Sequence, residues 1–265
     1  MAGLFGSMFD PTRVGPGVNK NAPKKKRFFL FFELYFRKFS KILGLNFIYI
    51  LCCIPIITIG PATAGLAYCM RNISREEHTE ISDFFDQFKK NFWQSLVTWI
   101  IFTLAFIAVI FGLIFYGALI KQGSFLGYAG FALCALSGII VLFMSYYVYM
   151  IIVTFKVNFR QLFKNSFIFA IIGIGRNIIT TIIISIILGW FAIYFLFPVV
   201  YPLYHPEVEA SISSACLAVS MFLFFIPSLI SFIINFNAYP NVKKFMIDPT
   251  LAKMPKEEEE AIFED

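Results

Sequence analysis

The sequence predicts an all-α protein, a polytopic membrane bundle of about six transmembrane helices. The first hairpin of this bundle is expected to be broken by Pro and Gly, and cytosolic elbow helices are expected to lie in the interface. Three observations predict the class. Of the 265 residues, 59% are hydrophobic and 14% are charged, whereas a soluble domain carries about 25% charged residues. Long uncharged apolar stretches recur along the chain, and Lys and Arg gather between alternate stretches.

The N-terminal segment is expected to lie outside the bilayer core. Residues 1–27 end in the basic run 24–27 and are predicted to form a flexible cytosolic arm. Residues 28–41 mix Phe and Leu with charged residues, which is typical of an interfacial helix. With a net charge of +6, the predicted partner is a lipid bilayer with anionic headgroups, and no nucleic acid is expected.

The first apolar stretch, 42–70, is interrupted in its middle and allows two interpretations. It forms either one long helix or two short helices, at about 42–56 and 60–75. A hairpin places every Lys and Arg on the cytosolic side except Lys121 and Arg176. A single crossing instead turns three basic loops outward, at 71–90, 156–164 and 243–256. Because Lys and Arg favour the cytosolic side of short loops, we predict the hairpin.

The later apolar stretches all exceed the roughly 20 residues that a spanning helix needs. They predict four more helices, at about 92–120, 125–155, 166–197 and 210–236. One membrane domain, 28–239, would hold all of them and would be followed by a cytosolic tail, 240–265. Both termini are therefore expected in the cytosol. The helix at 60–75 is short and is either a crossing or a half-helix.

Two similar segments precede long apolar helices on the predicted cytosolic side. Residues 85–91 align without gaps to 159–165, with Phe, Gln, Lys and Asn in register. Both are expected to be elbow helices along the inner interface. The first elbow is either a docking surface for another protein or an interfacial helix with Phe in lipid and charges in water. Its candidate docking residues are Phe84, Phe85, Phe88, Lys89 and Asn91.

The segment 55–65, PIITIGPATAG, is the most unusual part of the sequence. Pro removes a backbone donor and Gly permits tight turns, so a helix is expected to break here. At membrane depth the freed backbone groups must be buried by protein or lined by water. The break is therefore either part of a substrate path or a hairpin turn packed by small residues. The candidate residues are Pro55, Thr58, Gly60, Pro61 and Thr63.

Three polar residues fall within predicted membrane helices. Arg176 is a candidate functional residue, because a charge inside the membrane is costly. Its place near a membrane boundary equally allows its side chain to reach the inner surface. Asn46 and Asn177 are predicted to form hydrogen bonds between helices.

The sequence predicts no catalytic, metal or cofactor site, and no enzymatic activity. The two histidines, His78 and His205, fall on opposite sides of the predicted membrane and lack Cys or His at ligand spacing. The five cysteines lie in apolar segments without CxxC spacing and are expected to be packing residues. No Gly-rich phosphate loop is visible, which argues against an energy-coupled pump that works alone.

These motifs resemble the YesL family of bacterial integral membrane proteins, which contain a domain of unknown function. The likeness rests on 31–38 (FFELYFRK), 55–65 and 88–91 (FKKN), covers nearly the whole chain, and is greatest for clostridial members. The resemblance implies a multi-pass protein of the bacterial cell membrane, common in Firmicutes. Members are typically encoded beside carbohydrate ABC-transporter components. The family has no agreed active-site residues to carry over.

Three functions follow as hypotheses. The leading one is an accessory or regulatory subunit of a bacterial carbohydrate ABC importer, acting through contacts with its permease subunits. One alternative is a stand-alone transporter or channel for a small solute, with the broken hairpin lining its path. The other is a membrane sensor that signals through the first elbow. Flux in proteoliposomes that contain only this chain is expected only for the transporter.

Overall fold

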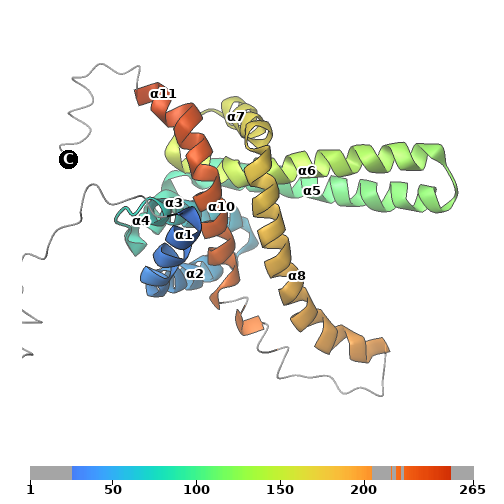
Figure 1. Ribbon diagram of the computed structural model, residues 1–265, viewed down its shortest axis with the longest axis horizontal. Helices are drawn as coiled ribbons and strands as arrows, with labels where there is room; N and C mark the ends of the chain where they lie inside the picture. The colour runs from blue at the N-terminus through green and yellow to red at the C-terminus, as the bar shows by residue number, and fades with distance from the viewer. Residues whose placement is uncertain (1–25, 205–215, 217–218, 222–223, 252–265) are drawn as a thin grey trace, which may run out of the picture.

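The computed structural model describes residues 26–204, 216, 219–221 and 224–251, and in these residues it contains helices and no strand (Figure 1). The all-α prediction is confirmed for this part of the chain. The first elements are α1 (Arg27–Arg37), α2 (Phe39–Cys53), the 3-10 turn η1 (Ile56–Thr58), α3 (Ile59–Ser74) and α4 (Ile81–Lys90). The longer helices follow, α5 (Phe92–Lys121), α6 (Phe125–Thr154), α7 (Phe159–Ile172) and α8 (Ile174–Tyr204). The last elements are α10 (Ile226–Val242), the π-helical turn η2 (Lys243–Ile247) and α11 (Asp248–Leu251).

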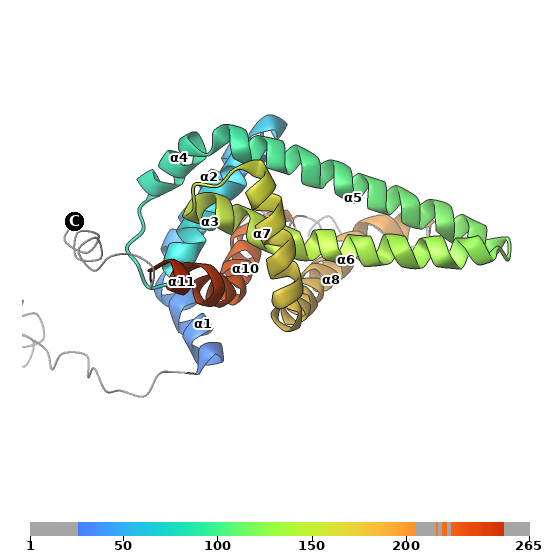
Figure 2. The same cartoon turned by 90° about the horizontal axis from the view of Figure 1, so that it is seen from above.

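Helices α5 and α6 form a long antiparallel hairpin, here called the arm, that reaches away from the other helices (Figures 1 and 2). Small residues bring the two helices close together. A Cβ on Gly130 would meet the ring of Tyr116 at 2.3 Å, and one on Gly112 would meet Cys134 Sγ at 2.7 Å. The turn at the far end contains Gly123, whose φ of +75° favours glycine. The arm is thus a closely packed pair whose outer surface remains exposed.

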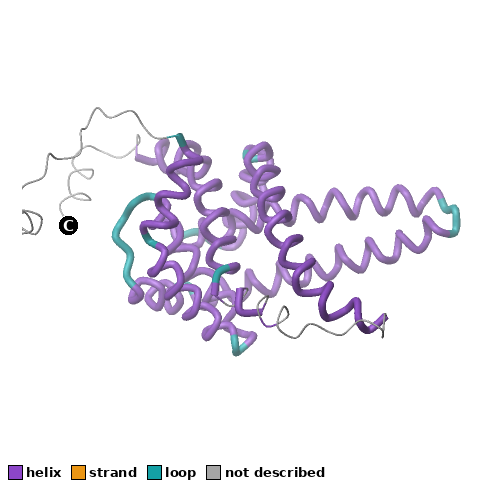
Figure 3. The backbone as a smooth tube through the Cα atoms, turned by 60° about the horizontal axis from the view of Figure 1, so that its bottom comes forward, coloured by secondary structure: helices purple, strands orange, loops and turns teal. Residues whose placement is uncertain are grey.

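Most of the other helices gather at the near end of the arm and form a compact group (Figure 3), whereas α8 starts there and runs away from it (Figure 1). This group, here called the base, comprises α1–α4, α7, α10, the start of α8 and the near ends of α5 and α6. Aromatic contacts join its first and last helices. The ring of Phe31 lies 5.1 Å from that of Phe232, and Tyr35 lies 5.9 Å from the same ring. Phe232 is fully buried, so these contacts belong to the core.

Three helical segments are long and apolar enough to cross a membrane, namely Phe92–Lys121, Phe125–Thr154 and Ile174–Tyr194. The first two have 30 residues each. At about 1.5 Å per residue they are about 45 Å long, which exceeds the roughly 30 Å of a hydrocarbon core. In the most apolar window of α5 only 11% of the residues are buried, so lipid suits its surface. A membrane-type helical protein is confirmed, with three candidate spans among the described residues where about six were expected.

The first hairpin consists of two short helices joined by η1, where the prediction left 60–75 as either a crossing or a half-helix. Helix α2 has 15 residues and α3 has 16, so neither reaches across about 30 Å of hydrocarbon. Helix α3 lies across the near end of the arm: a Cβ on Gly60 would meet the carbonyl oxygen of Ser95, and Arg71 contacts Thr154. Most of α3 is buried by other helices. Its apolar residues therefore face protein. Hydropathy suggested a crossing because it does not distinguish residues that face protein from residues that face lipid.

The C-terminal half also differs from the expected elements. In place of one helix over 166–197, α7 ends at Ile172 and α8 begins at Ile174. A Cβ on Gly173, between them, would lie 2.1 Å from the Tyr147 hydroxyl, so close packing against α6 accompanies the break. The predicted helix 210–236 lies partly outside the described residues, and its described part continues in α10 to Val242. Most of the predicted flexible N-terminal segment, 1–27, and much of the predicted tail, 240–265, also lie outside the described residues.

Candidate functional site

The turn between α2 and α3 carries the first two candidate hairpin residues. The N–H of Thr58 donates to the carbonyl oxygen of Pro55 at 2.8 Å, and its hydroxyl donates to the carbonyl oxygen of Cys52. Thr58 thereby satisfies a carbonyl that the end of α2 would otherwise leave unpaired. Pro55 is exposed, as are the apolar side chains beside it, Ile54, Ile56 and Ile57. Pro55 and Thr58 thus shape a turn that presents an apolar surface.

Gly60 and Pro61 begin α3 where it crosses the arm. A Cβ on Gly60 would lie 2.5 Å from the carbonyl oxygen of Ser95 and 2.8 Å from Cβ of Trp99, so only glycine permits this approach. Pro61 is buried in the first turn of α3, where a backbone donor is not required. These two residues let α3 pack tightly on α5.

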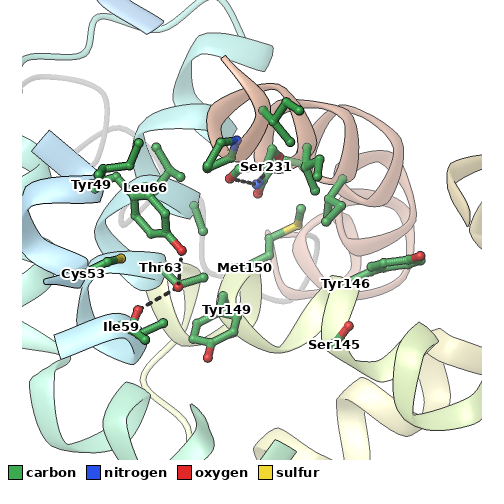
Figure 4. A pocket seen from close by; sticks show the side chains of 17 residues that line it. Tyr49, Cys53, Ile59, Thr63, Leu66, Ser145, Tyr146, Tyr149, Met150 and Ser231 are labelled. Carbon is green, nitrogen blue, oxygen red and sulfur yellow. Dashed lines mark hydrogen bonds between the residues drawn. The ribbon is translucent and has the colours of Figure 1, made fainter. Parts of the chain in front are cut away.

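Thr63 is the candidate residue that lines a partly open cavity (Figure 4). Its hydroxyl donates to the carbonyl oxygen of Ile59 at 2.7 Å and lies 3.4 Å from the hydroxyl of Tyr49. The cavity lies between α2, α3, α6 and α10 and has a volume of about 540 Å³. Its lining is mainly apolar and consists of Tyr49, Ile50, Cys53, Ile59, Thr63, Leu66, Ala67, Ser145, Tyr146, Tyr149, Met150, Ile226, Pro227, Ile230, Ser231, Ile234 and Asn235.

Asn235 is a polar residue of this cavity that sequence analysis did not single out. Its side chain is buried, and Nδ2 donates to the carbonyl oxygen of Ser231 at 2.8 Å. Its Oδ1 atom is buried and has no hydrogen-bond partner among the described residues. A buried acceptor without a donor is costly, so it favours a ligand that brings an O–H or N–H group. The spacing of Ser231 and Asn235 by one helical turn within an uncharged stretch was the available signal.

The chemistry of this cavity is that of an apolar binding site. Its volume falls within the roughly 300–1,000 Å³ of small-molecule pockets, and such pockets combine apolar walls with a few polar groups. None of the residues that line it is charged. The arrangement therefore offers van der Waals contact and a few hydrogen bonds, and it offers no acid–base pair.

Asn46 and Asn177 both join helices. The Oδ1 atom of Asn46 accepts a hydrogen bond from the backbone N–H of Ser228 at 2.8 Å, which ties α2 to the start of α10. Asn177 accepts from the Tyr147 hydroxyl at 2.8 Å and donates to the carbonyl oxygen of Ala170 at 3.0 Å. Asn241 of α10 donates to the same Tyr147 hydroxyl at 3.0 Å. Four helices, α6, α7, α8 and α10, thus meet in one buried polar network.

Arg176 lies beside this network in the first turn of α8. Its side chain is partly buried, and Nη1 is a buried donor without a hydrogen-bond partner among the described residues. Arg27, at the start of α1, is near enough to feel its charge. The structure thus places two guanidinium groups from distant parts of the chain within range of each other's charge.

The candidate docking residues on the first elbow, α4, do not form one open face. Phe84 is fully buried, and a Cβ on Gly65 of α3 would lie 3.0 Å from its ring. Phe88 is half-buried, whereas Phe85 and Lys89 are exposed. Asn91 donates to the side chain of Gln87 at 2.9 Å. The aromatic side of α4 therefore packs mainly on α3. Of the five candidate docking residues, Phe85 and Lys89 are the ones that are well exposed.

A buried arginine, Arg71, also connects two helices, α3 and α6, whereas sequence analysis treated it only as a loop charge. Its guanidinium donates to Thr154 Oγ1 at 2.8 Å and to Asn72 Oδ1 at 2.8 Å, and it lies 4.6 Å from the centre of the Tyr68 ring. Burial, and next the neighbouring Arg75, lower the pKa of this group. A cation is favourable at a helix C-terminus, so Arg71 stabilises the end of α6 against α3.

Comparison with known families gives one match, which includes the first hairpin. The model of a family described as "Protein of unknown function, DUF624" matches residues 42–113. This is the family to which YesL proteins belong, and the match covers the hairpin, α4 and much of α5. The resemblance is confirmed at this level, and the likeness to clostridial members stays a prediction. Neither the curated proteins nor the solved structures gave a match.

Proposed function

We propose that this chain is an accessory or regulatory membrane subunit of a bacterial carbohydrate ABC importer. It acts through contacts with the permease subunits inside the bilayer. Such a subunit needs a surface that neighbouring membrane helices can reach, and it needs a rigid fold that holds this surface in place. The arm offers the accessible surface, and the base is expected to supply the rigid fold.

The exposed surface of the arm is the observation that supports this proposal most directly. On α6 the small residues Ala129 and Ala132 are exposed, next to the exposed Leu133 and Leu136. Small residues allow membrane helices to approach closely, and van der Waals packing drives their association in lipid. The arm therefore suits lateral contact with another helical membrane protein.

The proposed topology is a multi-pass protein of the bacterial cell membrane with both termini in the cytosol. In this topology the arm crosses the bilayer and the base lies toward the cytosol. The charges support this placement, because Arg71, Arg75, Lys89 and Lys90 belong to the base or its loops. Lys121 is the basic residue at the far end of the arm. The positive-inside rule then favours a cytosolic base.

The two alternative functions gain less support. A path for a small polar solute would need hydrogen-bonding groups along its length, whereas the cavity beside Thr63 is mainly apolar. A sensor that signals through the first elbow would need an accessible aromatic face, whereas Phe84 is fully buried. We therefore favour the accessory subunit over a stand-alone transporter or a sensor.

Copurification from native membranes tests this proposal. The tagged chain is expected to recover a permease, an ATPase or a sugar-binding protein, identified by mass spectrometry. Ala132→Trp should lower this recovery because it places a bulky ring on the exposed face of α6. Ala108→Trp, at an exposed site on α5, is the matched control. Consistent absence of importer components from the wild-type sample would contradict the proposal.

A further inference from the structure

A groove separate from the cavity beside Thr63 lies between α1, α8 and α10. It has a volume of about 410 Å³. Its apolar lining includes Phe28 and Phe32 of α1, Ile183 and Ile187 of α8, and Ile233 of α10. Because α8 is a candidate membrane span with a mostly exposed surface, the groove faces lipid in the proposed topology.

Positive charge lies at one end of this groove. Arg27 belongs to its lining and donates to the carbonyl oxygen of Phe236 at 2.8 Å, with its guanidinium 5.1 Å from the Phe236 ring centre. Burial, and then the nearby charge of Arg176, lower the pKa of Arg27. The residues that line the groove include no acidic side chain. A guanidinium has five N–H donors, and among the described residues Arg27 uses one of them, toward Phe236.

Arg176 does not line the groove itself, but its charge acts on Arg27, and it carries an unsatisfied donor. Its buried Nη1 has no hydrogen-bond partner in the part of the chain that the structure describes. Two neighbouring cations without a carboxylate repel each other, and an anion between them would relieve this repulsion. Phosphate oxygens match guanidinium groups in geometry and charge.

The face of α8 that borders the groove changes from charged to apolar along its length. The spacing of a helix puts four residues on this face, in the order Arg176, Thr180, Ile183 and Ile187. From the first to the last of them the helix rises by about 16 Å. A headgroup followed by an acyl chain has the same order of polarity.

We propose that this groove binds one anionic glycerophospholipid, with its phosphate between Arg27 and Arg176 and one acyl chain along the apolar side chains of α1, α8 and α10. The bound lipid fills the space between α1 and α8 and ties both helices to α10. Basic pockets beside membrane helices are known to hold anionic headgroups. The site does not depend on the importer proposal, because it follows from the groove and its two cations alone.

Lipid retention in native mass spectrometry tests this site. The purified full chain in detergent is mixed with dioleoyl phosphatidylglycerol or with dioleoyl phosphatidylcholine, which carries the same chains on a zwitterionic head. We expect the anionic lipid to be retained about tenfold better. Equal retention of the two lipids overturns the proposal. Displacement of the lipid by millimolar inorganic phosphate would indicate a free-anion site and overturns the lipid assignment.

Variants separate the headgroup contact from the chain contact. Arg27→Gln with Arg176→Gln should reduce retention of the anionic lipid to that of phosphatidylcholine, and Arg176→Lys should retain part of the preference. Ile183→Trp fills the groove and should reduce retention of both lipids. Arg160→Gln, an exposed charge on α7, is the control and should change nothing. Unchanged retention in the double variant overturns the proposal, and denaturation midpoints verify that each variant is folded.

Discussion

The base and the arm are stabilised in different ways. In the base, polar side chains pair across helices, as Tyr147 does with Asn177 and Asn241. In the arm, α5 and α6 meet mainly through small residues such as Gly112 and Gly130. Hydrogen bonds between fixed partners specify a geometry more strongly than contact between apolar surfaces in lipid. The base is therefore expected to be rigid, and the arm to keep its outer surface free for lipid or another helix.

The largest effect is expected in the base, at Phe84. Phe84→Ala removes a fully buried ring and should lower the free energy of unfolding by about 3–5 kcal/mol. The midpoint of denaturation in detergent measures the loss. Phe85→Ala, an exposed site on the same helix, should cost less than about 1 kcal/mol. Equal effects of the two substitutions would show that the aromatic side of α4 is not packed against α3.

The next effect is expected where α7 meets α8. Gly173→Ala places a methyl group 2.1 Å from the Tyr147 hydroxyl and 2.7 Å from Asn241 Nδ2, so the buried network must open. Overpacking and lost hydrogen bonds together should cost about 3 kcal/mol. Gly175→Ala is the matched control, because its Cβ meets nothing within 4 Å and alanine favours a helix. A stable Gly173→Ala variant would contradict the rigid joint.

A smaller effect is expected in the arm. Gly130→Ala forces a Cβ toward the ring of Tyr116, yet the two helices can move apart into lipid. We expect a loss of about 1–2 kcal/mol, less than for Gly173→Ala. Gly117→Ala should be nearly neutral, because the nearest atom to its Cβ, Phe131 Cε2, is 4.0 Å away. If Gly130→Ala cost more than Gly173→Ala, the contrast between rigid base and adaptable arm would be lost.

The smallest effect is expected in the cavity beside Thr63. Asn235→Leu removes a buried acceptor that has no partner among the described residues, at the cost of a hydrogen bond to Ser231. The free energy of unfolding should change by less than about 1 kcal/mol. Asn177→Leu, which breaks bonds to Tyr147 and Ala170, should cost more. A strong loss for Asn235→Leu in thermal denaturation would mean that its oxygen is satisfied by a tightly bound group.

Composition was sufficient to predict a helical membrane protein, because hydropathy belongs to each segment by itself. It predicted about six spans, and three helical segments among the described residues are candidate spans. Ala62, Ala64 and Leu66 of α3 are as apolar as lipid-facing residues, yet they are buried by neighbouring helices. Hydropathy does not distinguish these two environments. Charge counting shares this weakness, because Arg71 was counted as a loop charge although it is buried against α6.

The sequence predicted only the local part of the candidate site. Pro and Gly act locally, so the signature indicated the turn at Pro55 and the close approach at Gly60. The cavity also depends on Asn235, which a distant segment brings near Thr63, and no local pattern joins these two residues. The spacing of Phe84 and Phe88 showed a shared face, but not whether this face meets lipid, a partner or the protein itself.

The central claim is that the arm crosses the bilayer while the base remains on its cytosolic side. Thiol labelling in intact cells tests this most directly. In a background whose five native cysteines are replaced by alanine, Ser82→Cys on α4 and Gln122→Cys at the far end of the arm are compared. A membrane-impermeant reagent should label only Gln122→Cys in intact cells, only Ser82→Cys in inverted vesicles, and both variants after permeabilisation. Labelling of both sites in intact cells, or of Ser82→Cys alone, would contradict the claim.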